Sequence, residues 1–406
     1  MIARVPVTAA STTAAGLARF EDRGPCTDAE RRAAAWLHDE LRASGHEAWV
    51  ETHWVRPQWA LSLALHATLG VVASLISVAT PLPAAILAAV AALSMAVEAS
   101  GRSGPLRRPF PRRATQNVLT VPDEEVGAAS DSDAALADAP GRGLVTLLIC
   151  ARYDAPRGGL ITRDGPRRLA ARLRRRLGGR ALGPRAWVAL ALAAVAVCAG
   201  LRELDVDASS LGLAQFVPTI ALLVALAAAS DVAVSPVSPG AGDNAAGVGV
   251  ALALHAELTR NPPDALAPAL LLYGAGEGGP PAVRAHLRRE KLQRERVVVL
   301  ELGPCGAGSP AYATVHPQLR AACARAADAL QGAARAPLRR SGAAAAARGR
   351  RLPAAWIGVL DAAGIVPRSR QPSDTLEHLD PAASEAVLDF ALACVDALDA
   401  ELATTT

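Results

Sequence analysis

The segments LLICARYDAPRGG, residues 147–159, and SPGAGDNAAGVGVALALHAEL, residues 238–258, decide the fold of this chain. The first is a continuous apolar run that ends in a charged turn. The second is a glycine-rich turn that opens an apolar helix. Continuous apolar runs of this length are typical of strands that are covered on both faces. Polar residues directly after such strands lie where α/β folds place a ligand crevice, so we expect a site around Arg152 and Asp243.

Three further segments continue the pattern: LLLYGAGEGG at 270–279, VVVLELG at 297–303 and RQPSDTLEHLD at 370–380. The sequence predicts strands at 47–53, 116–121, 143–150, 268–274 and 296–302. It predicts helices at 28–45, 244–259, 281–291, 316–334 and 382–402, and a loop or a poorly ordered helix at 341–351. Strands that alternate with helices predict an α/β domain with a doubly wound, mostly parallel sheet.

In their order and spacing the five segments resemble the di-zinc aminopeptidases, zinc exopeptidases whose relatives include glutamate carboxypeptidase and the transferrin receptor. The resemblance covers roughly residues 28–58, 114–162 and 235–400. It implies the zinc-exopeptidase fold. In that family the segments carry histidine, aspartate, a glutamate pair, aspartate and histidine, which hold the metal and supply the general base. We call the matching positions and their two supporting aspartates the remnant site: Arg152, Asp154, Asp243, Gly276, Glu277, Gly303, Arg370 and Asp374.

Four positions of the remnant site have lost the chemistry that the resemblance implies. Arg152 and Arg370 replace the two histidine ligands, and a guanidinium cannot accept a bond from a cation. Gly303 replaces an aspartate ligand. Gly276 replaces the general base, a loss worth about 10²–10⁴ in rate. We therefore expect no catalytic residue, no zinc and no other cofactor.

Four carboxylates of the remnant site are kept. Asp243 matches the ligand that bridges the metals, and Glu277 matches the ligand of the glutamate pair. Asp154 matches the residue that orients the first ligand, and Asp374 keeps the family's Asp-Thr pair. An N-cap is an equally good interpretation of Asp243, and a local turn of Asp374. Two carboxylates are fewer than the three ligands of a usual catalytic zinc, and His378 is the one histidine that could be recruited.

The two arginines could replace the charge of the metal. Carboxylates left together without a cation raise each other's pKa. We expect Arg152 and Arg370 to pair with Asp243 and Glu277 and to close the old cleft as an ion cluster. The alternative is that both arginines point to solvent.

Two apolar stretches interrupt the α/β pattern. Residues 59–97 carry no formal charge, and only His66 breaks their apolar character. A membrane helix takes about 20 apolar residues, so this stretch fits a transmembrane hairpin. Residues 186–230 fit a second hairpin, with its turn in the charged segment 201–210. Buried core helices are the alternative, against which the length and the missing amphipathic period argue.

The arginines predict an orientation in the cell membrane. Five follow the first hairpin between residues 102 and 113, eight precede the second between 167 and 185, and the hairpin tips carry almost none. Positive charge collects on the cytoplasmic side of membrane proteins. The pattern predicts a multi-pass protein whose termini and α/β domain are cytoplasmic.

A basic amphipathic segment, residues 163–185, precedes the second hairpin. Leu169, Leu173 and Leu177 recur every fourth residue with arginines around them. This predicts an interfacial helix that binds anionic lipids through residues 166–180. A solvated basic linker is the alternative. Nucleic-acid binding is not expected, because no aromatic residues interleave with the arginines.

Composition sets the remaining limits on function. The 406 residues have a net charge of +4 and a mean hydropathy of +0.23, in keeping with a chain partly in lipid. Six scattered cysteines predict neither a disulfide framework nor a structural zinc.

Residues 1–58, 101–162 and 235–406 would form the peptidase-like domain. We expect a pseudopeptidase that binds an unknown protein partner or acts as a scaffold. A divergent metallo-exopeptidase or other hydrolase with rearranged ligands and a small-ligand sensor are the alternatives.

Overall fold

The computed structural model describes residues 8–120, 144–176, 183–206, 208–290, 296–338 and 341–404. Its chain divides into two compact units. The α/β unit contains Met1–Val55, Arg113–Gly158 and Val237–Thr406, and the helical unit contains Arg56–Arg112 and Gly159–Pro236. The boundaries predicted at residues 58, 162 and 235 lie within a few residues of the ends of the segments that form the α/β unit. The boundary predicted at residue 101 differs, because residues 101–112 belong to the helical unit.

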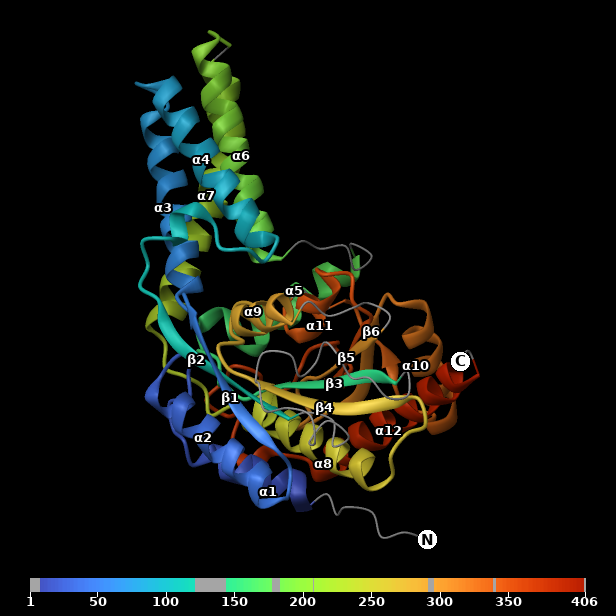
Figure 1. Cartoon of the computed structure of the whole chain (residues 1–406). Helices are drawn as coiled ribbons and strands as arrows, with labels where there is room; N and C mark the ends of the chain where they lie inside the picture. Colours follow the sequence, from blue (N-terminus) through green and yellow to red (C-terminus); the bar gives the residue numbers. More distant parts are fainter. Residues whose placement is uncertain are drawn as a thin grey trace. The chain divides into compact units, whose positions relative to one another are not determined.

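The described residues of the α/β unit form an eight-stranded sheet in the order β1-β2-β4-β3-β5-β8-β6-β7 (Figure 1). The strands are β1 Ala48–Val55, β2 Arg113–Thr120, β3 Val145–Arg152, β4 Leu266–Tyr273, β5 Val297–Leu302, β6 Ser309–Thr314, β7 Ala334–Arg335 and β8 Ala354–Leu360. The four central strands β4, β3, β5 and β8 are parallel, and β2 and β6 flank them in antiparallel pairs. The predicted mixed α/β architecture around a mostly parallel sheet is confirmed.

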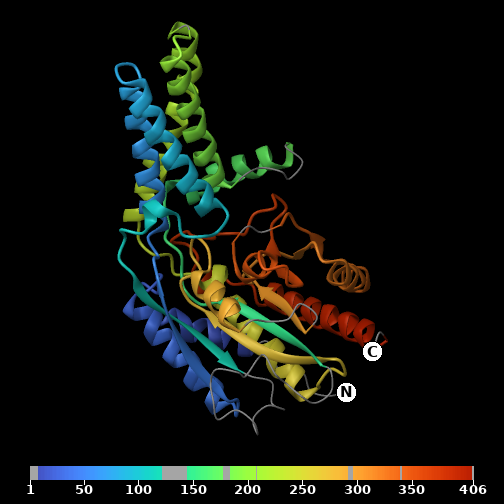
Figure 2. The ribbon, with the colours of Figure 1, turned by 45° about the horizontal axis from the view of Figure 1, so that its top comes forward.

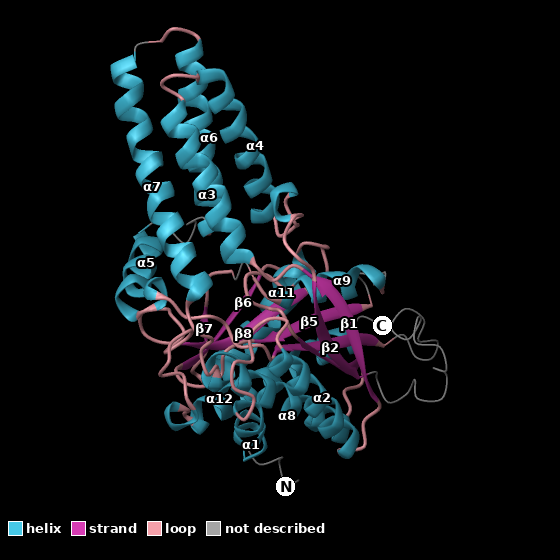
Figure 3. Ribbon diagram, turned by 90° about the vertical axis from the view of Figure 1, so that its left-hand side faces the viewer, coloured by secondary structure: helices cyan, strands magenta, loops and turns pink. Residues whose placement is uncertain are grey.

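Helices cover both faces of this sheet (Figures 2 and 3). Successive strand residues point to opposite faces, so Ile149 packs in one apolar core and Cys150 in the other. The helices are α1 Thr8–Ala18, α2 Asp28–Ala43, α8 Ala246–Arg260, α9 Pro281–Arg289, α10 Pro317–Leu330, α11 Ala343–Arg348 and α12 Pro381–Ala403. The first core takes its helical side chains from α1, α2, α8, α10 and α12, and the second from α9 and α11.

Two parts of the α/β unit differ from prediction. Strands β6, β7 and β8 were not predicted. β7 has only two residues and β6 begins with Ser309 and Pro310, which have little preference for a strand, whereas the apolar run AAWIGVL of β8 is typical of a covered strand and could have revealed it. The tract 341–351, predicted to be a loop or a poorly ordered helix, contains the short helix α11. Its alanines Ala343, Ala344 and Ala347 are fully buried in the second core. Alanine favours a helix, but a helix of six residues is not stable alone, so burial against the sheet supplies the rest of its stability.

Four long helices form a bundle in the helical unit (Figure 3). They are α3 Trp59–Ile76, α4 Pro81–Ala99, α6 Pro184–Glu203 and α7 Ala208–Val234. All four are long and apolar enough to span a membrane, judged by length and composition. The two predicted hairpins thus pack together, α4 on α6 and α3 on α7. Gly70 permits this packing, because a Cβ there would lie 2.4 Å from Leu192.

Buried polar contacts also join these helices. His66, the polar interruption of the first apolar stretch, is fully buried. Its Nδ1 donates to the carbonyl of Ser62 at 2.7 Å, so its Nε2 accepts from the Ser94 hydroxyl at 2.9 Å. Gln215 on α7 donates to the carbonyl of Ser74 on α3 at 2.9 Å. Such contacts hold apolar helices in one register where the surroundings offer no other partner.

The basic segment forms helix α5, Asp164–Arg176. Leu169 and Leu173 are both exposed on it, so the predicted apolar stripe is not buried within the helical unit. Asp164 begins the helix and forms ion pairs with Arg167 and Arg168. The third leucine of the stripe, Leu177, lies outside the described residues.

Candidate functional site

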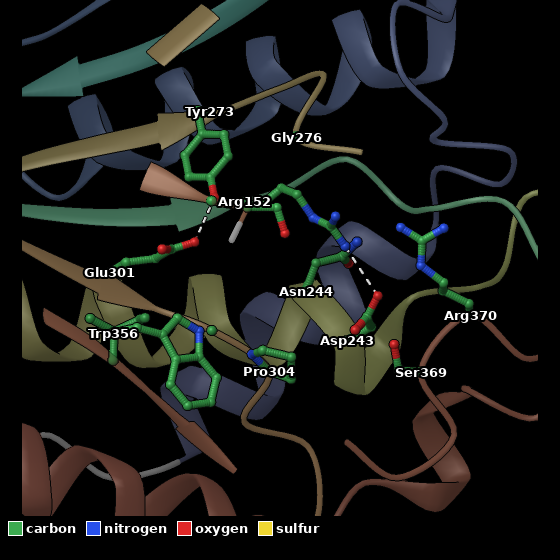
Figure 4. A pocket seen from close by; sticks show the side chains of 14 residues that line it. Arg152, Asp243, Asn244, Tyr273, Gly276, Glu301, Pro304, Trp356, Ser369 and Arg370 are labelled. Atoms are coloured by element: carbon green, nitrogen blue, oxygen red, sulfur yellow. Dashed lines mark hydrogen bonds and ion pairs between the residues drawn. The ribbon is translucent and has the colours of Figure 1, made fainter. Parts of the chain in front are cut away.

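The remnant site lies at the carboxyl ends of the parallel strands. Arg152 ends β3, Gly276 and Glu277 follow β4, and Gly303 follows β5. Because β4 and β5 lie on either side of β3, these residues meet at the point where the strand order reverses. Asp243 reaches the same place from a π-helical turn before α8 (Figure 4). Arg370 reaches Glu277 from the segment before Asp374, so the structure brings together residues from five distant segments.

Each arginine of the remnant site forms an ion pair with a carboxylate. Arg152 Nη2 donates to Asp243 Oδ2 at 3.1 Å, and Arg370 Nη1 donates to Glu277 Oε1 at 2.9 Å. The side chains of the first pair are 18% and 8% exposed, and those of the second pair 26% and 2%. Burial lowers the pKa of Arg152, but Asp154 and Asp243 raise it by more, so this guanidinium is held charged. The alternative in which both arginines point to solvent is wrong.

Gly276 is covered by the side chain of Arg152. A Cβ at residue 276 would lie 2.1 Å from Arg152 Cδ and 2.9 Å from Tyr273 Cε2. Real Cβ atoms do not approach other atoms so closely. The arginine therefore occupies the space through which a general base at this position would have to project.

Gly303 is covered in the same way by Trp356 of β8. A Cβ at residue 303 would lie 2.3 Å from Nε1 of the indole and 2.6 Å from Cε2. The indole is almost wholly buried, because Trp356 packs in the second core of the sheet. The position that the resemblance assigns to an aspartate ligand is thus filled by an aromatic ring.

Asp154 holds the backbone that follows β4. Its Oδ1 accepts from the N–H of Gly276 at 2.7 Å, and its Oδ2 accepts from the N–H of Glu277 at 3.3 Å. Its side chain is fully buried, and burial raises its pKa. Asp154 therefore acts here on the loop that carries Glu277, whereas the resemblance implies that it orients a metal ligand.

Asp374 holds the backbone of the turn that carries Asp243. Its two oxygens accept from the N–H groups of Gly242 at 2.7 Å and Asp243 at 3.1 Å. Burial and the nearby Asp243 charge raise the pKa of Asp374 to about 7. Asp243 itself is not an N-cap, because it lies inside the π-helical turn Ala241–Ala245 and α8 begins only at Ala246. Its side chain bonds Arg152 instead.

Arg23 is a supporting residue that the sequence did not reveal. Its guanidinium donates to the carbonyls of Tyr153 and Leu17, both at 2.6 Å, and to Asn244 Oδ1 at 3.0 Å. Burial lowers its pKa to about 10. Arg23 joins the end of β3 to the turn before α8. It lies in a short loop before α2, and no sequence pattern marks it among the many arginines of the chain.

Glu301 is a second residue that was missed, although it left a signal. It is the one charged residue in the apolar strand VVVLELG, two positions before Gly303. Its Oε1 accepts from the hydroxyl of Tyr273, and its Oε2 accepts from the N–H of Ala344, both at 2.9 Å. A buried carboxylate in a central strand destabilises the fold unless hydrogen bonds compensate for its burial. Such a residue in an apolar strand therefore indicates a structural or functional role nearby.

An open polar pocket of about 200 Å³ lies beside the two ion pairs. Its walls include Arg152, Asp243, Tyr273, Glu301, Trp356 and Arg370 (Figure 4). The expectation that the ion cluster closes the old cleft is therefore wrong. Both guanidiniums remain partly exposed to the pocket, and two aromatic rings line it together with two carboxylates.

The residues present do not fit the zinc that the resemblance implies. Asp243 and Glu277, the vestigial ligands, are each bonded to a guanidinium. His378 contacts the hydroxyl of Thr375 at 2.9 Å and is not among the residues that line the pocket. His255 is buried and packs edge-on against another histidine. The described residues thus bring no nitrogen ligand to Asp243 or Glu277.

No protein-family model and no curated protein matches this sequence. Solved structures do match. One is the Bacteroides thetaiotaomicron glutaminyl cyclase bound to N-acetylhistamine, with a TM-score of 0.54 and 11% identity over 98% of this chain and 99% of that chain. Another is a Zn-dependent exopeptidase from Parabacteroides distasonis, with a TM-score of 0.53 and 12% identity over 97% and 98% of the two chains.

The fold is zinc-exopeptidase-like. A leucine aminopeptidase precursor from Bacteroides thetaiotaomicron is similar to the same degree, with a TM-score of 0.53 and 12% identity over 98% of both chains. Identities this low concern the fold alone. The part of the resemblance that concerns the scaffold is confirmed, and the activity has to be argued from the site.

Proposed function

We propose that this protein is a membrane-embedded, catalytically inactive relative of the zinc aminopeptidases that binds a partner protein at the cytoplasmic membrane face. One observation carries the proposal: the places of the lost metal ligands and base are filled by other side chains. Arg152 covers Gly276 and bonds Asp243, while Trp356 covers Gly303. A vacant site could regain a metal by binding alone, whereas a filled one has to be rebuilt.

The electrostatics of the remnant site support the loss of metal. Asp243 and Glu277 already have positive partners 3.1 and 2.9 Å away. A second cation between them would meet both guanidiniums at close range, where like charges repel by several kcal/mol in a partly buried setting. Without metal, no bound water has its pKa lowered toward neutrality.

The membrane part of the proposal rests on the helical unit. Its four apolar helices have the length of membrane spans, and α5 exposes Leu169 and Leu173 among arginines. Such a helix suits an anionic lipid surface better than bulk water, because its apolar stripe otherwise stays unburied. The arginines that flank the hairpins favour a cytoplasmic α/β unit.

The test is the metal content of the purified protein, measured together with hydrolysis of a panel of aminoacyl and peptide substrates. We expect no hydrolysis, and no metal that depends on Asp243 or Glu277. A soluble zinc aminopeptidase assayed in parallel shows that the panel is competent. Chelator-sensitive hydrolysis that disappears in Glu277→Ala would overturn the proposal and identify a divergent metallo-exopeptidase.

The open pocket favours a second candidate function, the sensing of a small polar ligand. Its guanidiniums, carboxylates and indole offer charge and stacking surface together. A ligand that binds only the folded protein raises its Tm. A thermal-shift screen of small charged metabolites, repeated with Arg370→Gln, separates the two candidates. A hit that is lost in this variant identifies a sensor, whereas a silent screen leaves the scaffold.

A further inference from the structure

A second cluster of buried ligating side chains lies away from the remnant site, where helix α9 packs on the edge strand β1. Glu51 and His53 are two residues apart on β1, so they point to the same face of the strand. His286 and Glu290 are four residues apart at the end of α9, so they share one helix face. The two elements thus present two carboxylates and two imidazoles to each other.

The distances within this cluster are close to those of a metal site. One donor atom each of Glu51, His286 and Glu290 lies within 4.8 Å of the others. Glu51 Oε2 lies 2.9 Å from His286 Nδ1 and 3.1 Å from His53 Nε2. Zinc bonds of about 2.0–2.2 Å in a tetrahedral site separate the ligand atoms by roughly 3.3 Å. The Glu51–His286 pair would have to open slightly, and the group as a whole, which spans up to 4.8 Å, would have to close around the ion.

The burial of the cluster gives a second observation. Glu51, His286 and Glu290 are all buried, and His286 is only 1% exposed. Its Nδ1 donates to the Glu51 carboxylate, yet its Nε2 has no hydrogen-bond partner in the part of the chain that the structure describes. Buried ring nitrogens are nearly always satisfied by protein or by a bound group. The unbonded nitrogen lies across the ring from the one that faces Glu51, so His286 would bind an ion either through Nδ1, in place of its bond to Glu51, or through Nε2.

We propose that Glu51, His286 and Glu290 bind a divalent transition-metal ion, with Zn²⁺ as the best match, and that His53 supports Glu51 beside the site. Imidazole and carboxylate ligands without thiolates suit zinc, and three buried protein ligands leave one position of a tetrahedral ion to a further ligand. The ion would fasten the edge strand β1 to α9. This site shares no residue with the remnant site and is independent of the proposed loss of activity.

Arg289 is the residue that makes the proposal sharply testable. Its guanidinium lies 2.9 Å from Glu51 and 3.4 Å from Glu290 and so supplies the positive charge that the metal would bring. Its side chain is 47% exposed, which leaves it free to turn into solvent. Arg289 and the metal therefore compete for the same carboxylates. Its removal should tighten metal binding, whereas removal of His286 should abolish it.

The experiment is calorimetric titration of the full-length, chelator-treated protein in detergent with Zn²⁺, followed by Co²⁺ absorption spectroscopy. We expect about one ion per chain, an affinity at least tenfold lower in His286→Ala and Glu290→Gln, and a several-fold higher affinity in Arg289→Ala. His286→Gln serves as the second variant, because it keeps the size of the side chain where alanine impairs folding. His378→Ala replaces an exposed histidine, so it is the matched control and should bind like the wild type.

Two results would overturn the metal site. If neither the wild type nor Arg289→Ala binds more Zn²⁺ than His286→Ala, the cluster is an ion-pair network only. If bound metal is instead lost in Glu277→Ala and retained in His286→Ala, the ion belongs to the remnant site, and the proposed function fails while this cluster is excluded as a ligand set.

Discussion

At the scale of one residue, Arg152 has two effects. Its guanidinium neutralises the charge of Asp243, and its aliphatic stem fills the space above Gly276. Breaking a fully buried pair from one side costs about 3–5 kcal/mol, and an exposed pair is worth about 0–1 kcal/mol. This pair is mostly buried, so we expect Arg152→Ala to destabilise the protein by roughly 2–3 kcal/mol. Adding Asp243→Ala should recover part of that loss.

The measurement is the Tm of each variant in the same detergent. The matched control is Arg31→Ala, because Arg31 and Asp28 form an ion pair whose side chains are 62% and 65% exposed. Its effect should be small. An Arg152→Ala variant as stable as Arg31→Ala would contradict the structural role of the pair.

Gly276 gives a second prediction at this scale. A side chain there collides with the stem of Arg152, and forcing atoms into a packed site costs about 1–3 kcal/mol. Gly276→Ala and Gly276→Glu should therefore both lower the Tm. Arg152→Gly removes the colliding stem, so in that background Gly276→Ala should have much less effect. Equal losses in the two backgrounds would refute the steric argument.

Asp374 predicts how stability depends on pH. Its pKa is raised to about 7 in the folded protein, against an ordinary value of about 3.9 in an unfolded chain. Between these values the folded state holds a proton that the unfolded state has lost. The stability from this group is full below about pH 4 and is lost as the pH rises through about 7. Burial raises the pKa of Glu30 to about 8, which acts in the same direction.

We therefore expect the Tm to fall between about pH 5 and pH 8, with a shallower slope in Asp374→Asn and the shallowest in the double variant with Glu30→Gln. Thermal denaturation in one buffer series measures all three. The slopes rather than the absolute values are compared, because each substitution also changes hydrogen bonds. A wild-type Tm that rises over this range would contradict the assignment.

At the scale of elements, the sequence predicted those strands and helices that have a regular apolar pattern. Apolar runs predicted β3, β4 and β5, and because polar residues follow these strands directly, the position of the remnant site could be predicted with them. The alanine tract of α11 could not be predicted as an ordered helix, since its stability comes from burial against the sheet. Arg23 and Trp356 were missed because Arg23 reaches the site from a loop and Trp356 reaches it from β8, and long-range packing leaves no local pattern.

Helix α5 carries a prediction about lipid. An environment-sensitive fluorophore on Leu169→Cys should shift to the blue in nanodiscs with anionic lipids, because the apolar stripe then enters the interface. The shift should weaken at high salt, since the arginines provide part of the attraction. Ala170→Cys, one residue around the helix, is the control and should shift less. Equal shifts at both positions, or none, would favour the solvated linker.

At the scale of the whole molecule, the proposed topology is open to labelling in intact cells. A membrane-impermeant thiol reagent applied outside should reach cysteines introduced at Thr80 and Asp205, in the hairpin turns. It should not reach cysteines at Arg108 or Arg175, which belong to the arginine-rich segments that are expected to stay cytoplasmic. Labelling of the second pair alone would invert the orientation, and labelling of all four would place the helices outside the bilayer.

The collisions at Gly276 and Gly303 also determine how many substitutions a metal site would need here. To regain a ligand at either position, a descendant would need two coordinated substitutions, one to restore the carboxylate and one to remove the arginine stem or the indole that took its place. Either change alone would give a less stable protein, because it leaves either a crowded carboxylate or a cavity where the stem or the indole was. Each side chain that lies over one of these glycines therefore adds one compensating substitution to any route that leads from this chain to a metal-binding enzyme.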